Sequence, residues 1–152
     1  MNEIQVLIQL TAAFFGSVGF AIILRIRGKQ IAYSGVGGLM TWGIYLIAFQ
    51  VADSYFMGNF VASIFIAFYA EVCARRNKAP ATIFLIASAV PLIPGRNLYN
   101  MMFGLVSQNS AMAWENGVTA LVIALAIALG FVVVTVLNKY VSRMKRFAKD
   151  VL

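Results

Sequence analysis

Long apolar segments separated by short polar ones dominate the sequence. Residues 4–24 are 21 consecutive residues without a charged side chain. At a rise of about 1.5 Å per residue, a helix of this length crosses a hydrocarbon core of about 30 Å. A second uncharged segment of this kind covers residues 117–138. The apolar region around Asp53 is too long for one helix, so we expect two membrane spans there, near 32–52 and 54–74.

A further apolar segment, residues 81–109, is interrupted near its middle. Residues 91–95 include two prolines and a glycine, and Arg96 is the only charged residue of the segment. Proline lacks a backbone N–H and clashes with the preceding turn, so a helix bends or ends at such a site. The sequence therefore predicts an all-α polytopic membrane protein with a single transmembrane domain (1–152) of about five helices, the fourth broken at Pro91–Gly95.

Composition and charge support this class and add an orientation. Of 152 residues, 62% are hydrophobic and 11% are charged, whereas soluble domains average about 45–50% and 25%. The connections after the first, third and fifth predicted spans hold 11 of the 12 basic residues: Arg25, Arg27, Lys29, Arg75, Arg76, Lys78, Lys139, Arg143, Lys145, Arg146 and Lys149. Cytoplasmic loops collect Lys and Arg, so we expect a multi-pass protein of the cell (cytoplasmic) membrane with its N-terminus out and its C-terminus in. The opposite, outer side then holds Glu3, Asp53 and Glu115.

The net charge of +7 would point to nucleic acid in a soluble protein. Here the basic residues follow the topology and the connections are too short for a binding module, so we expect no nucleic-acid partner. In the basic cytoplasmic tail, residues 139–152, apolar side chains recur at helical spacing: Val141, Met144, Phe147, Ala148 and Val151. This pattern predicts a helix lying on the anionic inner leaflet of the bilayer. A surface for docking a partner protein is the alternative.

The chain has little of the chemistry that enzymes need. It contains no histidine and one cysteine, Cys73, which argues against ordinary zinc sites, Cys–His pairs and internal disulfides. The glycine-rich segment 35–38 has neither a Walker lysine nor a preceding strand, so phosphate binding is not expected. We therefore expect no enzyme activity, no metal and no cofactor, and we expect Cys73 to be a packing residue.

The charge inside the broken segment is the strongest indication of a binding site. On a straight helix from residue 81, Arg96 would lie about 22 Å into the core, where an arginine costs at least roughly 2.5–3.5 kcal/mol unless it contacts polar groups, water or a ligand. A helix that restarts after Gly95 presents unpaired N–H groups, which bind anions such as a substrate carboxylate. The side chains expected at this site are those of Arg96, Asn97, Tyr99 and Asn100. The alternative is a kinked span whose arginine reaches the outer interface and binds nothing.

Glu71 allows two interpretations. It precedes Arg75 by four residues on the predicted third span, the orientation that favours a helical ion pair. Ionisable groups inside spans also form proton relays, so proton coupling at Glu71 is the alternative. Three further residues are candidates for the polar lining of a cavity: Gln50, Asn59 and Asn116.

Several of these residues belong to an ordered set of motifs. An acidic residue followed by Ala-Arg comes first, then a Lys-x-Pro-Ala step, then Pro-x-x-Pro-Gly and a nearby tyrosine; here they are residues 70–76, 78–81, 91–95 and Tyr99. In this order the motifs resemble those of the threonine/serine exporter family, in particular its short second-component type (YjjB-like). The resemblance implies an exporter of small carboxylates, which are threonine and serine in some members and succinate in others. It also puts weight on Glu71, Pro91, Pro94, Gly95 and Tyr99, whereas Arg96 is not part of the pattern.

Members of that family either fuse two membrane halves or split them into a larger and a smaller protein, and this chain resembles the smaller. The leading hypothesis is therefore a subunit of a secondary transporter whose path is completed by a larger membrane subunit of the same family. Small residues four apart, such as Ala126 and Gly130, favour close helix contacts. They leave open a non-transporting scaffold or assembly subunit, and also a homo-oligomer. The sequence does not distinguish an amino acid from a dicarboxylate, because both present a carboxylate.

Overall fold

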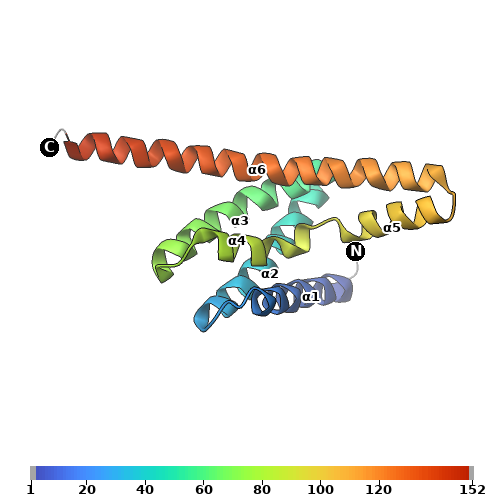
Figure 1. The fold of residues 1–152 in the computed structure, drawn as a ribbon, viewed down its shortest axis with the longest axis horizontal. Helices are drawn as coiled ribbons and strands as arrows, with labels where there is room; N and C mark the ends of the chain where they lie inside the picture. The colour runs from blue at the N-terminus through green and yellow to red at the C-terminus, as the bar shows by residue number, and fades with distance from the viewer. Residues whose placement is uncertain (1–2, 151–152) are drawn as a thin grey trace.

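The computed structural model of the chain describes residues 3–150, without the side chains of residues 142 and 145–150. These residues form a bundle of helices (Figure 1). The helices are α1 (Glu3–Ile23), α2 (Lys29–Ala52), α3 (Tyr55–Asn77), α4 (Ala81–Ala89), the 3₁₀ turn η1 (Val90–Leu92), α5 (Gly95–Val106) and α6 (Ser110–Asp150). The described part of the chain contains no strand, so the predicted all-α class is confirmed.

Among the described residues, four helices are long and apolar enough to cross a membrane, namely α1, α2, α3 and α6. The pair formed by α4–η1 and α5 adds a fifth crossing that is bent by 56° at the break. The four to five candidate spans agree with the predicted count and include the broken fourth span. The side of the membrane on which each terminus lies stays a prediction.

The last helix begins earlier than the hydropathy pattern predicted. It starts at Ser110 rather than near Gly117, because the Asn109 side chain accepts a hydrogen bond from the N–H of Met112 (3.1 Å). An asparagine in this position caps a helix by satisfying one of its unpaired N–H groups. The first turns of α6 carry polar side chains, so apolar periodicity alone does not reveal them.

The basic tail is the C-terminal part of α6 and not a separate helix. No glycine or proline follows Gly130, and α6 continues to Asp150 as a single element (Figure 1). At about 1.5 Å per residue, its 41 residues extend about 60 Å, twice the thickness of the hydrocarbon core. The tail thus continues the last span without a break as far as Asp150, and its position on the inner leaflet stays a prediction. In the tail Val141 and Met144 are exposed, whereas the side chains of Phe147 and Ala148, and all of Val151, lie outside the described residues.

Small residues bring the helices close together. A side-chain carbon at Gly130 of α6 would collide with the Ser63 hydroxyl and lie 3.0 Å from the Phe60 carbonyl oxygen on α3. A side-chain carbon at Gly38 of α2 would collide with the Ser17 hydroxyl of α1. Hydrophobicity alone does not hold helices together in lipid, so such close approaches supply the van der Waals contact that does.

Interhelical hydrogen bonds fix the first half of the broken span. The Ser88 hydroxyl of α4 donates to the Ser34 carbonyl of α2 (3.0 Å). The Tyr69 hydroxyl of α3 donates to the Tyr33 carbonyl of α2 (2.8 Å). Phe84 of α4 is fully buried among these helices. Helix α4 therefore belongs to a packed body formed by α1 to α4.

Helix α5 is arranged differently from α4. It packs on α6, and the α5–α6 hairpin extends beyond the α1–α4 body at the end where α1 begins (Figure 1). The two halves of the broken span thus belong to different parts of the fold. The break lies where the hairpin joins the body.

Candidate functional site

The break between α4 and α5 is built by its two prolines. Helix α4 gives way to the 3₁₀ turn η1, which contains Pro91. Pro94 disfavours helical backbone at the residue before it, and Ile93 is accordingly extended (φ −63°, ψ 126°). Freed carbonyl groups find local partners: Val90 accepts from the Ile93 N–H (3.1 Å), and Ile93 accepts from the Gly95 N–H (2.7 Å). The predicted break at Pro91–Gly95 is confirmed.

Helix α5 begins with an open N-terminal turn. Pro94 precedes the helix, and no side-chain hydrogen bond caps it. The N–H of Leu98 donates to the Pro94 carbonyl (3.0 Å), whereas the N–H groups of Arg96 and Asn97 have no hydrogen-bond partner among the described residues. Unpaired N–H groups at a helix start carry partial positive charge and attract anions. This turn is therefore chemically suited to a carboxylate.

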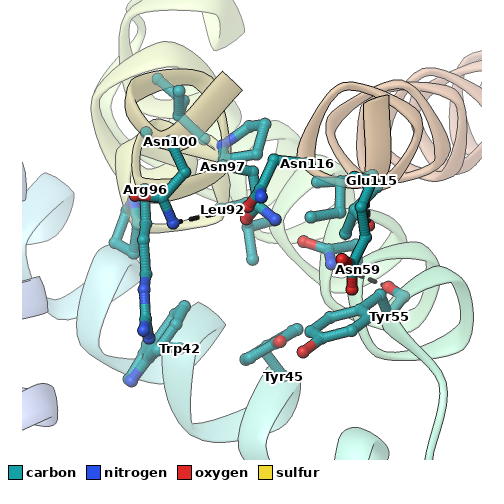
Figure 2. A pocket seen from close by; sticks show the side chains of 16 residues that line it. Trp42, Tyr45, Tyr55, Asn59, Leu92, Arg96, Asn97, Asn100, Glu115 and Asn116 are labelled. Atoms are coloured by element: carbon teal, nitrogen blue, oxygen red, sulfur yellow. Dashed lines mark hydrogen bonds between the residues drawn. The ribbon is translucent and has the colours of Figure 1, made fainter. Parts of the chain in front are cut away.

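A cavity of about 460 Å³ lies beside this helix start. Its walls come from α2, α3, the break, α5 and α6 (Figure 2). It is lined by six of the residues that the sequence pointed to as substrate-binding: Pro91, Pro94, Gly95, Arg96, Asn97 and Asn100. These residues share one cavity, and their role in binding stays a prediction.

Tyr99 is the one substrate-binding candidate that the structure places outside the cavity lining. It does not line the cavity and is 69% exposed. Successive residues of an α-helix point about 100° apart, so Tyr99 lies off the helix face on which Asn100 meets the cavity. Its ring stacks on that of Phe103, with the ring centres 6.3 Å apart and the planes 11° apart. Tyr99 therefore lies on a different face of α5.

Amide and hydroxyl groups complete the cavity wall. Asn59 of α3 is 3% exposed, and its amide donates to the Tyr55 carbonyl (2.8 Å). Asn100 of α5 donates to the side chain of Asn116 on α6 (3.4 Å), which links the two helices of the hairpin. Asn59 and Asn116 line the cavity, whereas Gln50 does not. The remaining uncharged polar and aromatic lining residues are Trp42, Tyr45, Tyr55 and Thr119.

Glu115 is a lining residue that the apolar pattern did not predict. It faces the cavity from α6, on the side opposite Arg96 and Trp42 (Figure 2). A last span that begins at Gly117 leaves Glu115 in an outer loop, but the observed helix start places it one turn before Thr119. Glu115 is followed by polar residues one and four positions later, Asn116 and Thr119. This spacing, together with the Asn109 cap, is the sequence signal for a polar face of α6.

Glu71 does not line this cavity. Its carboxylate lies 3.5 Å from the Arg75 guanidinium, and the two side chains are 38% and 62% exposed, respectively. The ion pair expected from their spacing is thus present, and exposed pairs of this kind contribute only about 0.3–0.5 kcal/mol. Glu71 also borders a small recess with Asn138 of α6, whose amide nitrogen has no hydrogen-bond partner in the described part of the chain. Proton coupling at Glu71 stays a prediction.

The cavity brings charged and polar side chains together. Among the described lining residues, the charged side chains are one guanidinium and one carboxylate, and the other polar groups are amides, phenols, a hydroxyl and the Trp42 indole. Among the side chains that the structure describes, no three from His, Cys, Asp or Glu converge on a metal position. Cys73 packs with Ala70 and Phe84, away from the cavity lining. The cavity can hold a small charged molecule.

Comparison with known proteins identifies relatives of the chain. Residues 9–137 match the family described as Threonine/Serine exporter, ThrE. A threonine/serine exporter of Corynebacterium glutamicum is 25% identical over 130 residues, which cover 86% of this chain and 26% of that protein. The chain thus spans about a quarter of the length of this curated relative. No solved structure matches this chain. Because the matched region includes all helices except the ends of α1 and α6, this multi-pass membrane protein belongs to the threonine/serine exporter family.

Proposed function

We propose that the chain is a subunit of a secondary transporter that exports small carboxylates across the cytoplasmic membrane. Threonine and serine, or a dicarboxylate such as succinate, are the proposed substrates. The observation that carries the proposal is the cavity at the break, where Arg96 and the open first turn of α5 line the same space. Membership of an exporter family supports export as the direction of transport.

The proposed contacts follow from the groups at the start of α5. A substrate carboxylate would accept hydrogen bonds from the unpaired N–H groups of Arg96 and Asn97. The Arg96 guanidinium would add a charge-assisted and, in its best geometry, bidentate contact. Asn100 would supply further polar contacts. The cavity of about 460 Å³ exceeds the size of any of these substrates, so ordered water would fill the remaining space.

A larger membrane subunit of the same family is the proposed partner. Arg96 and Glu115 are exposed within this chain, and a charge facing hydrocarbon costs at least about 2.5–3.5 kcal/mol near the bilayer centre. Another protein surface that closes the cavity would remove this cost and complete the path. The relative from Corynebacterium glutamicum is about four times as long as the matched region, which leaves room for such a surface within one protein. A second copy of this chain is the alternative partner.

Transport by the assembled pair tests the proposal. The chain would be reconstituted into liposomes with a larger family member from the same organism, and efflux of preloaded threonine, serine and succinate would be measured. Efflux of at least one substrate, present only when both proteins are present, is the expected result. Equal efflux from liposomes that contain the larger protein alone would contradict a transporting role for this chain.

An assembly subunit that transports nothing is the second candidate. Helix α5 packs on α6 and otherwise exposes apolar side chains, which would suit a docking surface: Leu98, Tyr99, Met102, Phe103, Leu105 and Val106. For such a subunit, variants of the cavity would lose export only when they also lose the partner. Export lost by a cavity variant that still copurifies with the partner would exclude this candidate.

Glu71→Gln is expected to preserve export but to remove its dependence on a pH gradient. Glutamine has nearly the same size and cannot take up a proton, so only the proposed proton coupling is removed. Initial efflux rates with and without an imposed pH gradient measure the effect. Arg75→Ala is the matched control, because it breaks the ion pair and leaves the carboxylate in place. Gradient dependence retained by Glu71→Gln would leave Glu71 with the ion pair alone.

A further inference from the structure

Two opposite charges line the cavity without pairing. Arg96 comes from α5 and Glu115 from α6, and both are exposed. Figure 2 shows them on opposite sides of the cavity. The ion pair found within the described residues joins Glu71 to Arg75 and involves neither of them. Charges of opposite sign that share a cavity without meeting are available to a ligand that carries both signs.

The surroundings of Glu115 suit a positively charged group. Its backbone carbonyl accepts a hydrogen bond from the Thr119 hydroxyl (2.9 Å), but its carboxylate has no partner among the described residues. The Tyr55 ring lies on the same side of the cavity as Glu115 in Figure 2, and Tyr45 lies beside it. Aromatic faces attract cations, so the carboxylate and the rings favour the same ligand charge.

We infer that Glu115 selects the substrate by binding its ammonium group, so that the cavity prefers α-amino acids to carboxylates that lack an amine. The inference rests on the proposed function, because it needs a substrate carboxylate at Arg96 and the start of α5. It assigns to α6 a contact that the motifs around the break do not contain. Glu115 is thereby a specificity-determining residue of the site.

The two ends of the cavity would contribute differently to selection. The start of α5 and Arg96 recognise a carboxylate, which threonine, serine and succinate all present. A zwitterion brings its ammonium group to Glu115, whereas a dicarboxylate brings a second negative charge toward that carboxylate. A site with a buried or unpaired charge discriminates most strongly against the ligand that leaves the charge unmatched. Discrimination between the two substrate classes therefore depends on Glu115 and not on Arg96.

Threonine and 3-hydroxybutyrate form the ligand pair that tests this inference, because 3-hydroxybutyrate is threonine without its amino group. The dissociation constants of both would be measured on the purified pair of subunits, with wild-type chain and with Glu115→Gln. Wild type is expected to bind threonine about ten- to a hundredfold more tightly, the usual effect of a charge-assisted contact. In Glu115→Gln the two constants should agree within a factor of about three.

Three further variants test whether the preference depends specifically on the negative charge at Glu115. Glu115→Asp retains the charge and should retain the preference for threonine. This result would show that the site tolerates a substitution at this position. Asp53→Asn removes a carboxylate from the turn after α2, outside the cavity, and should leave both dissociation constants unchanged. Arg96→Ala should weaken both ligands to a similar extent, because it removes the carboxylate contact that they share.

An unchanged preference in Glu115→Gln, with binding still dependent on Arg96, would overturn the inference and leave the proposed function intact. Export by Glu115→Gln that keeps the preference but loses its dependence on a pH gradient would also overturn it, since Glu115 would then carry a proton and not select substrate. If the wild-type pair binds neither ligand, or if Arg96→Ala binds both as wild type does, the proposed function itself fails.

Discussion

Arg96→Ala is expected to reduce threonine export about ten- to a hundredfold, because hydrogen bonds to charged groups contribute about 1.5–3 kcal/mol. The substitution removes the guanidinium from the cavity wall beside the open turn of α5. It leaves the break intact, since the extended conformation of Ile93 depends on Pro94 and not on the arginine. Initial efflux rates at several internal threonine concentrations, measured on the reconstituted pair, give the loss directly.

Two companion variants separate the binding role of Arg96 from a general loss of positive charge. Arg96→Lys keeps the charge but loses the bidentate geometry, so intermediate export is expected. Arg76→Ala removes an arginine in the last turn of α3, outside the cavity, and should export like wild type. Export by Arg96→Ala at the wild-type rate would contradict substrate binding at Arg96, on which the proposed function rests.

Gly130→Ala is expected to destabilise the protein by about 1–3 kcal/mol, the usual cost of an added group in a packed interface. The new methyl group would collide with the Ser63 hydroxyl and lie 3.0 Å from the Phe60 carbonyl oxygen, forcing α6 away from α3. Because α6 also supplies Glu115 and Asn116 to the cavity, binding should weaken together with stability. Thermal unfolding in detergent measures the change in stability.

A size exchange across the same contact gives the control. Ser63→Gly combined with Gly130→Ala removes the colliding hydroxyl and should recover part of the lost stability. Gly19→Ala adds a methyl group where no atom lies within 4 Å, and it should be neutral or slightly stabilising because alanine favours helix. A stability of Gly130→Ala equal to that of Gly19→Ala would show that α3 and α6 are not closely packed at this point.

Features that depend on local backbone chemistry were predictable from the sequence. Pro91 and Pro94 act on residues next to them, so the interruption and the restart of the helix at Gly95 follow from the peptide chemistry alone. The side chains near that restart are neighbours in sequence, so they lie close together however the rest of the chain packs. For this reason Arg96, Asn97 and Asn100 were found as a group.

Features that depend on packing between distant segments were not predictable in the same way. Tyr99 is even closer to the break in sequence than Asn100, but the direction in which each side chain points is set by how α5 rotates against α6. Glu115 lies in a polar stretch, and its place on a helix depends on the cap at Asn109, which a hydropathy pattern does not detect. Asn59 reaches the cavity only because α3 packs on α6.

Threonine protection of a single thiol in the cavity tests most directly whether the cavity at the break binds substrate. Thr119 lines the cavity, whereas the neighbouring Val118 lines a separate apolar groove between α5 and α6. The native Cys73 is buried, so a polar thiol reagent reports on Thr119→Cys or Val118→Cys alone. At ten times the dissociation constant, threonine should slow the labelling of Thr119→Cys about tenfold, in proportion to the unoccupied fraction, and leave Val118→Cys unchanged. Labelling of Thr119→Cys at the same rate with and without threonine, in a pair that still exports it, would contradict substrate binding in this cavity.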